Sequence, residues 1–494
     1  MSRFARITFV CGVALILPVS PSGVEAQTPA QDAAKKEGAA SIASMNEFQA
    51  QEKKMSQLVR EGYKFTKDQA SSLEETLAQT PDDLNVRARL MGYYFAPGSQ
   101  SLGAEARIQS RRRHILWLIR NHPGSWLLMT SEASLDPRGH VLADPEGYGQ
   151  AGKAWLEQTE KKDASAALLG NAGRFFYLHD KALSVQFYAR ARKLEPEREL
   201  WGIMQGSVMA FAVIGVTEMG QNGLPGPADP KEADSDFAKS VRRELDTTKD
   251  TALMRAAAGE LMNRGFMAQS WARRQAGETP PVDALGLAES LLKRSQELDP
   301  GKPISGDLAR IYELRGMVAT SEAEKKALAS ARYEQLEKST SGMSADDPAN
   351  SAPLLALARA SLDAGDLDRA QTLAKSLLAL VPKVKADPRF SGSVDGLVHH
   401  SHLILGRVAL RKGDIDAAKA NLLDASRVGG GGTLSSFGPN MTLAKELLEK
   451  GETETVLQYF ELCRKFWTFS NRMDPWIEAI RKGQIPNFGA NLNY

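Results

Sequence analysis

Histidines form one cluster in this 494-residue chain, at His399-His400-Ser401-His402. His399 and His402 are three positions apart, so on a helix they share a face, at a spacing that suits two ligands of a metal ion. A metal site needs a third ligand, and the sequence offers no fixed partner for this pair. We therefore interpret the cluster as packing on a helix face, and we expect neither a metal nor a cofactor.

A run of glycines, Gly429 to Gly432, precedes a predicted helix. Backbone amides in such a loop can bind an anion at the start of the helix. A phosphate-binding loop also has a preceding strand and a following lysine, and this run has neither. We interpret the run as a flexible connector after a helix end.

The sequence lacks the motifs of a nucleophile elbow, a zinc protease helix and a dinucleotide-binding loop. Paired carboxylates such as Asp82-Asp83 and Asp346-Asp347 fall in predicted turns, where we expect them to cap helices. Catalytic carboxylates pair in space and not in sequence, so a carboxylate enzyme stays open at this point. We expect a protein that is not an enzyme.

The formal net charge is +2, which gives no general attraction to nucleic acid or to an anionic membrane. The densest basic run is Arg111-Arg112-Arg113-His114. Consecutive positions on a helix spread around its circumference, so these side chains cannot form one patch. We interpret the run as a solvated helix face and expect no nucleic-acid partner.

The chain contains two cysteines. Cys11 lies in the N-terminal apolar run, which leaves Cys463 as the single thiol of an exported chain. Cys463 belongs to a helical apolar stripe with Val456, Phe460 and Trp467. We therefore expect a buried small side chain and not a reactive thiol.

The N-terminus has the pattern of a secretory signal peptide, predicted over residues 1–26. Arg3 and Arg6 form a basic start, an apolar run follows up to Val19, and Val24-Glu25-Ala26 is a small-residue cleavage site. An uncleaved anchor is the alternative, but the apolar run is short for a bilayer span. We expect cleavage near Ala26 and a periplasmic or secreted protein, with residues 27–45 as a flexible leader.

Helical periodicity dominates the rest of the chain, and β-branched residues are sparse. We expect an all-α fold with an N-terminal helical repeat block at 46–222, middle helical hairpins at 223–350, and C-terminal repeats with a cap at 351–494. Trp201 to Met219 is the most apolar stretch. Its polar residues leave too short an apolar core for a membrane span, so we expect a buried central helix and no stable membrane insertion.

The sequence pattern of one helical hairpin occurs twice between Leu354 and Ala425. In both copies small residues lie where two helices would cross and a Gly-Asp pair forms the turn: Ala358, Ala370 and Gly365-Asp366 in the first, Gly406, Ala418 and Gly413-Asp414 in the second. The glycine can end one helix with a positive φ, and the aspartate can cap the next. The copies lie further apart than a repeat of about 34 residues. We predict that the second helix of the first copy stops at Pro382 and that an inserted loop spans Val384 to Gly396.

This arrangement resembles the tetratricopeptide repeat, in which small residues sit at the helix crossing and proline closes the unit. The resemblance covers Leu168–Pro196, Leu354–Pro382 and His402–Gly430. It implies an α-solenoid of antiparallel helix hairpins, with long inserted loops. The aromatic residues between Tyr459 and Tyr494 are expected to form a C-terminal capping helix module, with a partner-docking patch as the alternative.

The resemblance further implies that the first helix of each hairpin lines a groove that holds a protein or peptide. On that basis the partner-binding residues are Asn171, Arg174, Arg359, Arg407 and Arg411. We expect an exported, non-catalytic scaffold for an unidentified protein or peptide. Two alternatives stay open: a glycan-processing enzyme with an (α/α) toroid, and an envelope assembly factor.

Overall fold

The computed structural model describes residues 53–96, 102–138, 142–218, 226, 228–266 and 282–492, and every regular element within these ranges is a helix. The prediction of an all-α fold is confirmed. The predicted signal peptide and leader lie outside the described residues, as does Tyr494. Contacts within the chain divide it into two compact units, and the boundary falls between Leu298 and Asp299.

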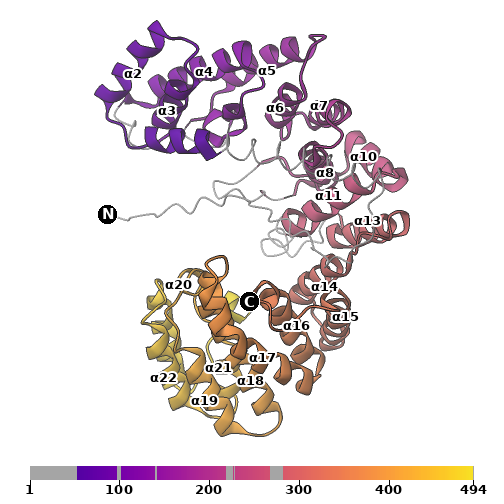
Figure 1. Cartoon of the computed structure of the whole chain (residues 1–494), viewed down its shortest axis with the longest axis vertical. Helices are drawn as coiled ribbons and strands as arrows, with labels where there is room; N and C mark the ends of the chain where they lie inside the picture. The colour runs from indigo at the N-terminus through magenta and orange to yellow at the C-terminus, as the bar shows by residue number, and fades with distance from the viewer. Residues whose placement is uncertain are drawn as a thin grey trace, which may run out of the picture. The chain divides into compact units, whose positions relative to one another are not determined.

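In the first unit, helices pack mainly against their neighbours in sequence (Figure 1). A helix at 53–62 comes first. The later ones are α2 (Lys67–Gln79), α3 (Leu84–Phe95), α4 (Ala104–Asn121), the short η2 (Trp126–Met129), α5 (Pro145–Thr159), α6 (Ala166–Phe176), α7 (Lys181–Leu194), α8 (Glu199–Ile214), α9 (Pro230–Ala233), α10 (Asp236–Thr247), α11 (Thr251–Glu260) and α13 (Ala284–Leu298).

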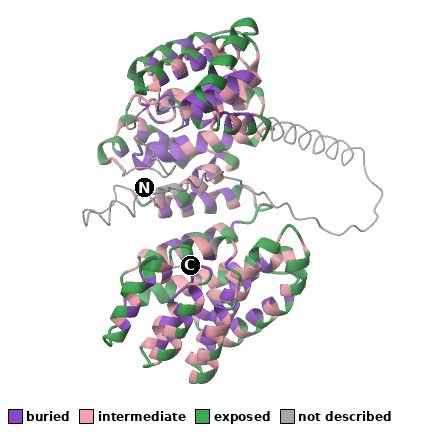
Figure 2. Cartoon of the chain, turned by 90° about the vertical axis from the view of Figure 1, so that its left-hand side faces the viewer, coloured by how far each residue is buried: buried purple, intermediate pink, exposed green. Residues whose placement is uncertain are grey.

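The second unit follows the same plan of consecutive packing (Figure 1). Its helices are α14 (Ser305–Val318), α15 (Glu322–Thr340), α16 (Ser351–Ala364), α17 (Leu367–Ala386), α18 (Val394–Arg411), α19 (Ile415–Ala425), α20 (Thr433–Phe437), α21 (Thr442–Leu448), α22 (Thr453–Cys463) and α23 (Met473–Arg481). Figure 2 shows buried residues along the sides of these helices that face neighbouring helices.

Helix α8 lies in the interior of the first unit. It contacts α7, α10 and α11, and its residues from Val208 to Ile214 are almost completely buried. The sequence prediction of a buried central helix is confirmed. Within the described ranges, no helix combines the length and the hydropathy that crossing a bilayer requires.

The two predicted turns have the expected local chemistry. Gly365 has φ 93° and Gly413 has φ 84°, which are left-handed values that glycine adopts without steric cost. Asp366 accepts a hydrogen bond from the Arg369 amide at 3.0 Å, and Asp414 accepts one from Ala417 at 2.9 Å. Each aspartate therefore starts the second helix of its hairpin.

The small residues at the predicted crossings are buried, as expected. Ala358, Ala370 and Ala418 are each 0% exposed, and Gly406 is buried as well. A Cβ on Gly406 would lie 3.3 Å from the carbonyl oxygen of Ala418 on α19. The short side chains therefore let consecutive helices approach closely, as ridge-into-groove packing requires.

The predicted stop at Pro382 and the predicted inserted loop at 384–396 are wrong. Helix α17 continues through Pro382 to Ala386, and α18 already begins at Val394. Proline inside a helix costs about 3 kcal/mol because it removes one backbone hydrogen bond and clashes with the preceding turn. Leu380 and Val384 lie one turn apart and are 2% and 0% exposed, so burial of this stripe offsets the cost. A longer α17, an earlier start of α18 and a short connection at 387–393 therefore take the place of the predicted loop.

Aromatic residues form the core of the C-terminal helices. Tyr459, Phe460 and Phe488 are at most 1% exposed, and they share one apolar cluster with Ala418 and Leu422 of α19. The Trp467 and Trp476 rings stack at 6.0 Å. Most of the described aromatics at this end are therefore core residues, as a capping module requires, whereas Phe469 is exposed.

Cys463 lies inside the same cluster and is 0% exposed. Burial raises the pKa of its thiol well above the usual range, against a smaller opposing effect of the Tyr459 hydroxyl. We expect the native protein not to react with a thiol reagent such as dithionitrobenzoate, because the thiolate is the reactive form. The thiol should react completely once urea unfolds the chain. Rapid reaction of the native protein would show that the C-terminal core opens.

Candidate functional site

The predicted partner-binding residues fall into two groups. Arg359 lies on α16, and Arg407 and Arg411 lie on α18, so the second unit holds three of them. Asn171 and Arg174 lie on α6 of the first unit. The structure brings the three arginines of the second unit into one electrostatic neighbourhood, because Arg407 acts on the charge of both Arg359 and Arg411.

Acidic side chains alternate with these arginines across successive helices. Arg332 Nη2 lies 2.9 Å from Glu313 Oε1, and Arg332 Nη1 lies 3.8 Å from Asp363 Oδ2. Asp363 Oδ1 then lies 3.5 Å from Arg407 Nη1, and Arg407 Nη2 lies 2.8 Å from Glu446 Oε1. We call this surface the charged face; it consists of Glu313, Arg332, Arg359, Asp363, Arg407, Arg411 and Glu446. Its members come from α14, α15, α16, α18 and α21.

Arg359 is the cation of the charged face without a partner. It is half-buried and makes no hydrogen bond or ion pair with any described residue. Burial lowers the pKa of its guanidinium to about 10, the nearby Arg332 charge adds to this, and Glu313 and Asp363 oppose it. The guanidinium is still charged at neutral pH. Its burial therefore has a desolvation cost, which Glu313 and Asp363 offset only in part and without a direct contact.

The other two arginines are engaged within the unit. Burial would lower the pKa of Arg407, but the bidentate pair with Glu446 and the charge of Asp363 outweigh it, so that pKa is raised. Arg411 donates a hydrogen bond to the Leu362 carbonyl of α16. Both therefore fix the position of α18 against its neighbours, and of these three arginines only Arg359 has no described partner for any of its N–H donors.

His399 is an internal connector of the second unit. It is 0% exposed, its Nδ1 lies 2.7 Å from the Ala425 carbonyl, and its Nε2 accepts a hydrogen bond from the Asn440 amide at 3.2 Å. The neutral form with the proton on Nδ1 satisfies both contacts. His402 Nδ1 pairs separately with the side chain of Asn421 at 3.0 Å. Within the described ranges, no three His, Cys, Asp or Glu side chains come together as a metal site requires.

The glycine run is not a flexible connector. The Gly431 amide donates to Asp395 Oδ2 at 2.7 Å, and a Cβ on Gly430 would lie 2.2 Å from the Phe466 side chain. Gly430 also has φ 80°, a value that favours glycine. The loop therefore does present an amide to an anion, but the anion is a carboxylate of α18.

The two residues of α6 predicted to line a groove make contacts within the first unit. Asn171 is 3% exposed, and its amide nitrogen donates to the Pro123 and Ser125 carbonyls at 2.7 and 3.0 Å. Arg174 is half-buried, with its guanidinium carbon 6.0 Å from the centre of the Tyr177 ring. The Asn171 amide therefore holds the preceding loop and does not project into solvent.

The basic run on α4 is not a solvated face. Arg111 and His114 are each 1% exposed, and Arg112 pairs with the buried Asp144 at 2.5 Å. His114 Nε2 lies 2.9 Å from Glu74, which also accepts from Arg113 at 2.7 Å. Burial would raise the pKa of Glu74, but His114 and the other donors outweigh it and lower that pKa to about 2. The run therefore ties α4 to other segments of the first unit, among them α2 and the start of α5.

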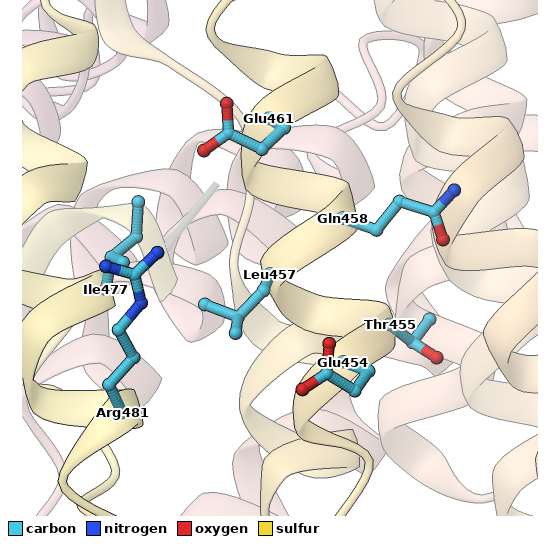
Figure 3. Close-up of a pocket in the computed structure, with 7 residues that line it drawn as sticks. All are labelled: Glu454, Thr455, Leu457, Gln458, Glu461, Ile477 and Arg481. Carbon is cyan, nitrogen blue, oxygen red and sulfur yellow. The ribbon is translucent and has the colours of Figure 1, made fainter.

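A separate surface depression lies between α22 and α23 (Figure 3). Glu454, Leu457 and Glu461 of α22 face Ile477 and Arg481 of α23 across it. Its charged side chains are exposed to solvent, so water screens them and they are not held in a fixed arrangement. The side chains of the charged face, by contrast, are held by ion pairs, so the charged face is the better candidate for a binding site.

The fold and the charged face together define a protein built of consecutively packed helices, with a half-buried cation surrounded by ion pairs. The sequence matches no protein-family model and no curated protein.

Proposed function

We propose that the protein is an exported, non-catalytic scaffold with tetratricopeptide-like hairpins, which binds a protein or peptide partner through its charged face. The matched Gly-Asp turns and the buried small residues of the two C-terminal hairpins support the repeat type. The pattern of a signal peptide supports export to the periplasm or outside the cell. A membrane-docked envelope assembly factor would be one form of such a scaffold.

The observation that carries the proposal is Arg359, the one arginine of the charged face that makes no hydrogen bond or ion pair with a described residue. Four arginines of the charged face are opposed by three carboxylates, so the face has an excess of positive charge. An acidic side chain or a C-terminal carboxylate of a peptide complements this excess. A hydrogen bond to a charged group contributes about 1.5–3 kcal/mol, which corresponds to roughly 10- to 100-fold in affinity.

The ion pairs around Arg359 fix the geometry in which it is presented. Arg332 and Arg407 both contact Asp363, which is one turn after Arg359 on α16. Each carboxylate of the charged face has an arginine partner, which favours binding over general acid catalysis, because a catalytic acid must hold a proton near neutral pH. We therefore place recognition, and not glycan hydrolysis, on this face.

Replacement of Arg359 by methionine tests the proposal directly. Methionine keeps the apolar part of the side chain and removes the unpaired charge, so we expect equal or slightly higher stability. Selection from a random-peptide display library should enrich aspartate and glutamate on the wild-type protein. We expect Arg359→Met to lose that enrichment, with a drop of about tenfold or more in affinity for the selected peptides.

The matched control is Arg389→Met. Arg389 is in the same unit, its side chain is 76% exposed, and it pairs with Asp387 outside the charged face. This variant should retain the enrichment. Equal enrichment on Arg359→Met, or no acidic preference on the wild-type protein, would contradict the proposed function.

A further inference from the structure

A small pocket with both polar and apolar walls lies in the first unit, apart from the charged face and independent of the proposed function. Its volume is about 120 Å³, and η2 and the first turns of α6 and α8 line it. Its walls include Trp126, Met129, Leu200 and Trp201, and Asn171 adds a polar group. Pockets for cofactors and drug-sized ligands measure about 300–1,000 Å³, so this one has room for a single side chain only.

The walls of the pocket are held rigidly. The Trp201 ring donates from Nε1 to Glu195 at 2.8 Å, and the guanidinium of Arg198 covers its face at 4.7 Å. The edge of the same ring packs on Gly170, where a Cβ would lie 2.1 Å from the indole. The observed position of the Trp201 ring therefore requires glycine at position 170 of α6. A pocket that is already shaped costs little conformational entropy when it is filled.

Asn171 has one hydrogen-bonding atom to spare. Its amide nitrogen is used twice, by the Pro123 and Ser125 carbonyls, and this fixes the orientation of the side chain. Its oxygen Oδ1 accepts no hydrogen bond from any described residue, and it is not sealed from solvent. A nearly buried acceptor beside apolar side chains is suited to a ligand that carries a hydrogen-bond donor next to an apolar group.

We propose that this pocket binds one leucine- or methionine-sized side chain of an extended peptide, and that a backbone N–H of that peptide donates to Asn171 Oδ1. The room is equivalent to about four water molecules, and Trp126, Met129 and Leu200 belong to the apolar part of its wall. Displacing such waters by an aliphatic side chain is favourable, by roughly 10- to 100-fold in affinity over glycine. The N–H contact adds about two- to tenfold.

Ligand-observed nuclear magnetic resonance on the full chain tests the proposal with N-acetyl-leucine methylamide as the probe. We expect saturation transfer to be strongest at the leucine methyl groups. N-acetyl-glycine methylamide should give about a tenth of the effect or less. Methylation of the leucine backbone nitrogen, which removes the donor, should weaken binding about two- to tenfold.

Ala167→Trp supplies the blocking variant, because Ala167 lines the pocket on α6 and is only partly buried. This variant should lose the leucine signal and keep the helical content of the wild-type protein. Ala182→Trp, at a similarly half-buried alanine of α7 outside the pocket, should keep the signal. An unchanged signal in Ala167→Trp would overturn the proposal, and so would equal binding of the leucine and glycine probes. A dimer of the wild-type chain that Ala167→Trp dissociates would assign the pocket to a second copy and overturn it as well.

Discussion

Replacing Gly92 with alanine should destabilise the first unit by about 3 kcal/mol, at the upper end of the range for overpacking a core. A Cβ at Gly92 of α3 would lie 2.0 Å from the carbonyl oxygen of Val59 in the helix at 53–62. The opposing Gly62 has the same relation to α3, since its Cβ would lie 1.9 Å from the Arg89 carbonyl oxygen. Two backbones touch at this crossing, and a backbone cannot move aside as a side-chain end can. Urea denaturation followed by circular dichroism measures the loss.

Gly149→Ala is the matched control for this crossing. Gly149 is also inside a helix, α5, but it is exposed and nothing lies near a Cβ placed there. Alanine should therefore stabilise that helix by up to about 1 kcal/mol. Gly62→Ala should repeat the effect of Gly92→Ala, and the double variant should lose less than the sum, because the first substitution already separates the helices. Wild-type stability of Gly92→Ala would mean that the two helices do not touch.

The parts of the fold that depend on local chemistry could be predicted from the sequence. Gly365-Asp366 and Gly413-Asp414 encode the end of one helix and the start of the next within two residues. The length of the helices could not be predicted in this way. Pro382 is a stop by local rules, and only the burial of Val384 in the assembled unit explains why α17 continues.

Charged residues show the same difference between local and long-range information. Arg111 donates to the Glu132 and Ser134 carbonyls, and Arg112 pairs with Asp144. These partners are more than 20 positions away, and no spacing rule links them to α4. In the sequence a basic run therefore has the pattern of a solvated face, although every member is paired in the fold, Arg113 and His114 with the same Glu74.

The candidate site was predictable in part for this reason. Helix phase identified Arg359, Arg407 and Arg411 as sharing one side of their hairpins, and the structure places them in one neighbourhood. Helix phase does not predict which arginine forms an ion pair with a carboxylate. Glu446 of α21 pairs with Arg407, Arg411 bonds to a backbone carbonyl, and Arg359 has neither kind of contact with a described residue. That distinction, on which the proposed function depends, required the three-dimensional arrangement.

Acid should destabilise the second unit through His399, and replacement of His399 by leucine should remove much of this effect. Burial lowers the pKa of His399 to about 4, although its bond to the Ala425 carbonyl opposes this, against a value of roughly 6.5 in an unfolded chain. Between pH 6.5 and 4, the unfolded chain binds a proton that the folded chain excludes. The free energy of unfolding therefore falls as the pH falls through this window, by about 3 kcal/mol in total, and stays constant above it.

His399→Leu also has a cost at neutral pH. It leaves the Ala425 carbonyl and the Asn440 amide buried without their partner, which should destabilise the unit by about 3 kcal/mol. The difference in the free energy of unfolding between the variant and the wild type should then shrink as the pH approaches 4. Only the wild type has His399, so only the wild type loses stability through its protonation. Urea denaturation at a series of pH values measures both effects.

Two further variants separate His399 from its neighbours in this measurement. His402→Leu removes a histidine from the same helix but leaves both bonds of His399 in place, so it should retain the acid-dependent loss of the wild type. Burial also lowers the pKa of His400, so His399→Leu should reduce the pH dependence and the double variant with His400→Leu should reduce it further. A pH profile of His399→Leu that parallels the wild type would mean that His399 is accessible to protons in the folded unit. Its two bonds would then not be the link between α18, the end of α19 and the loop at Asn440.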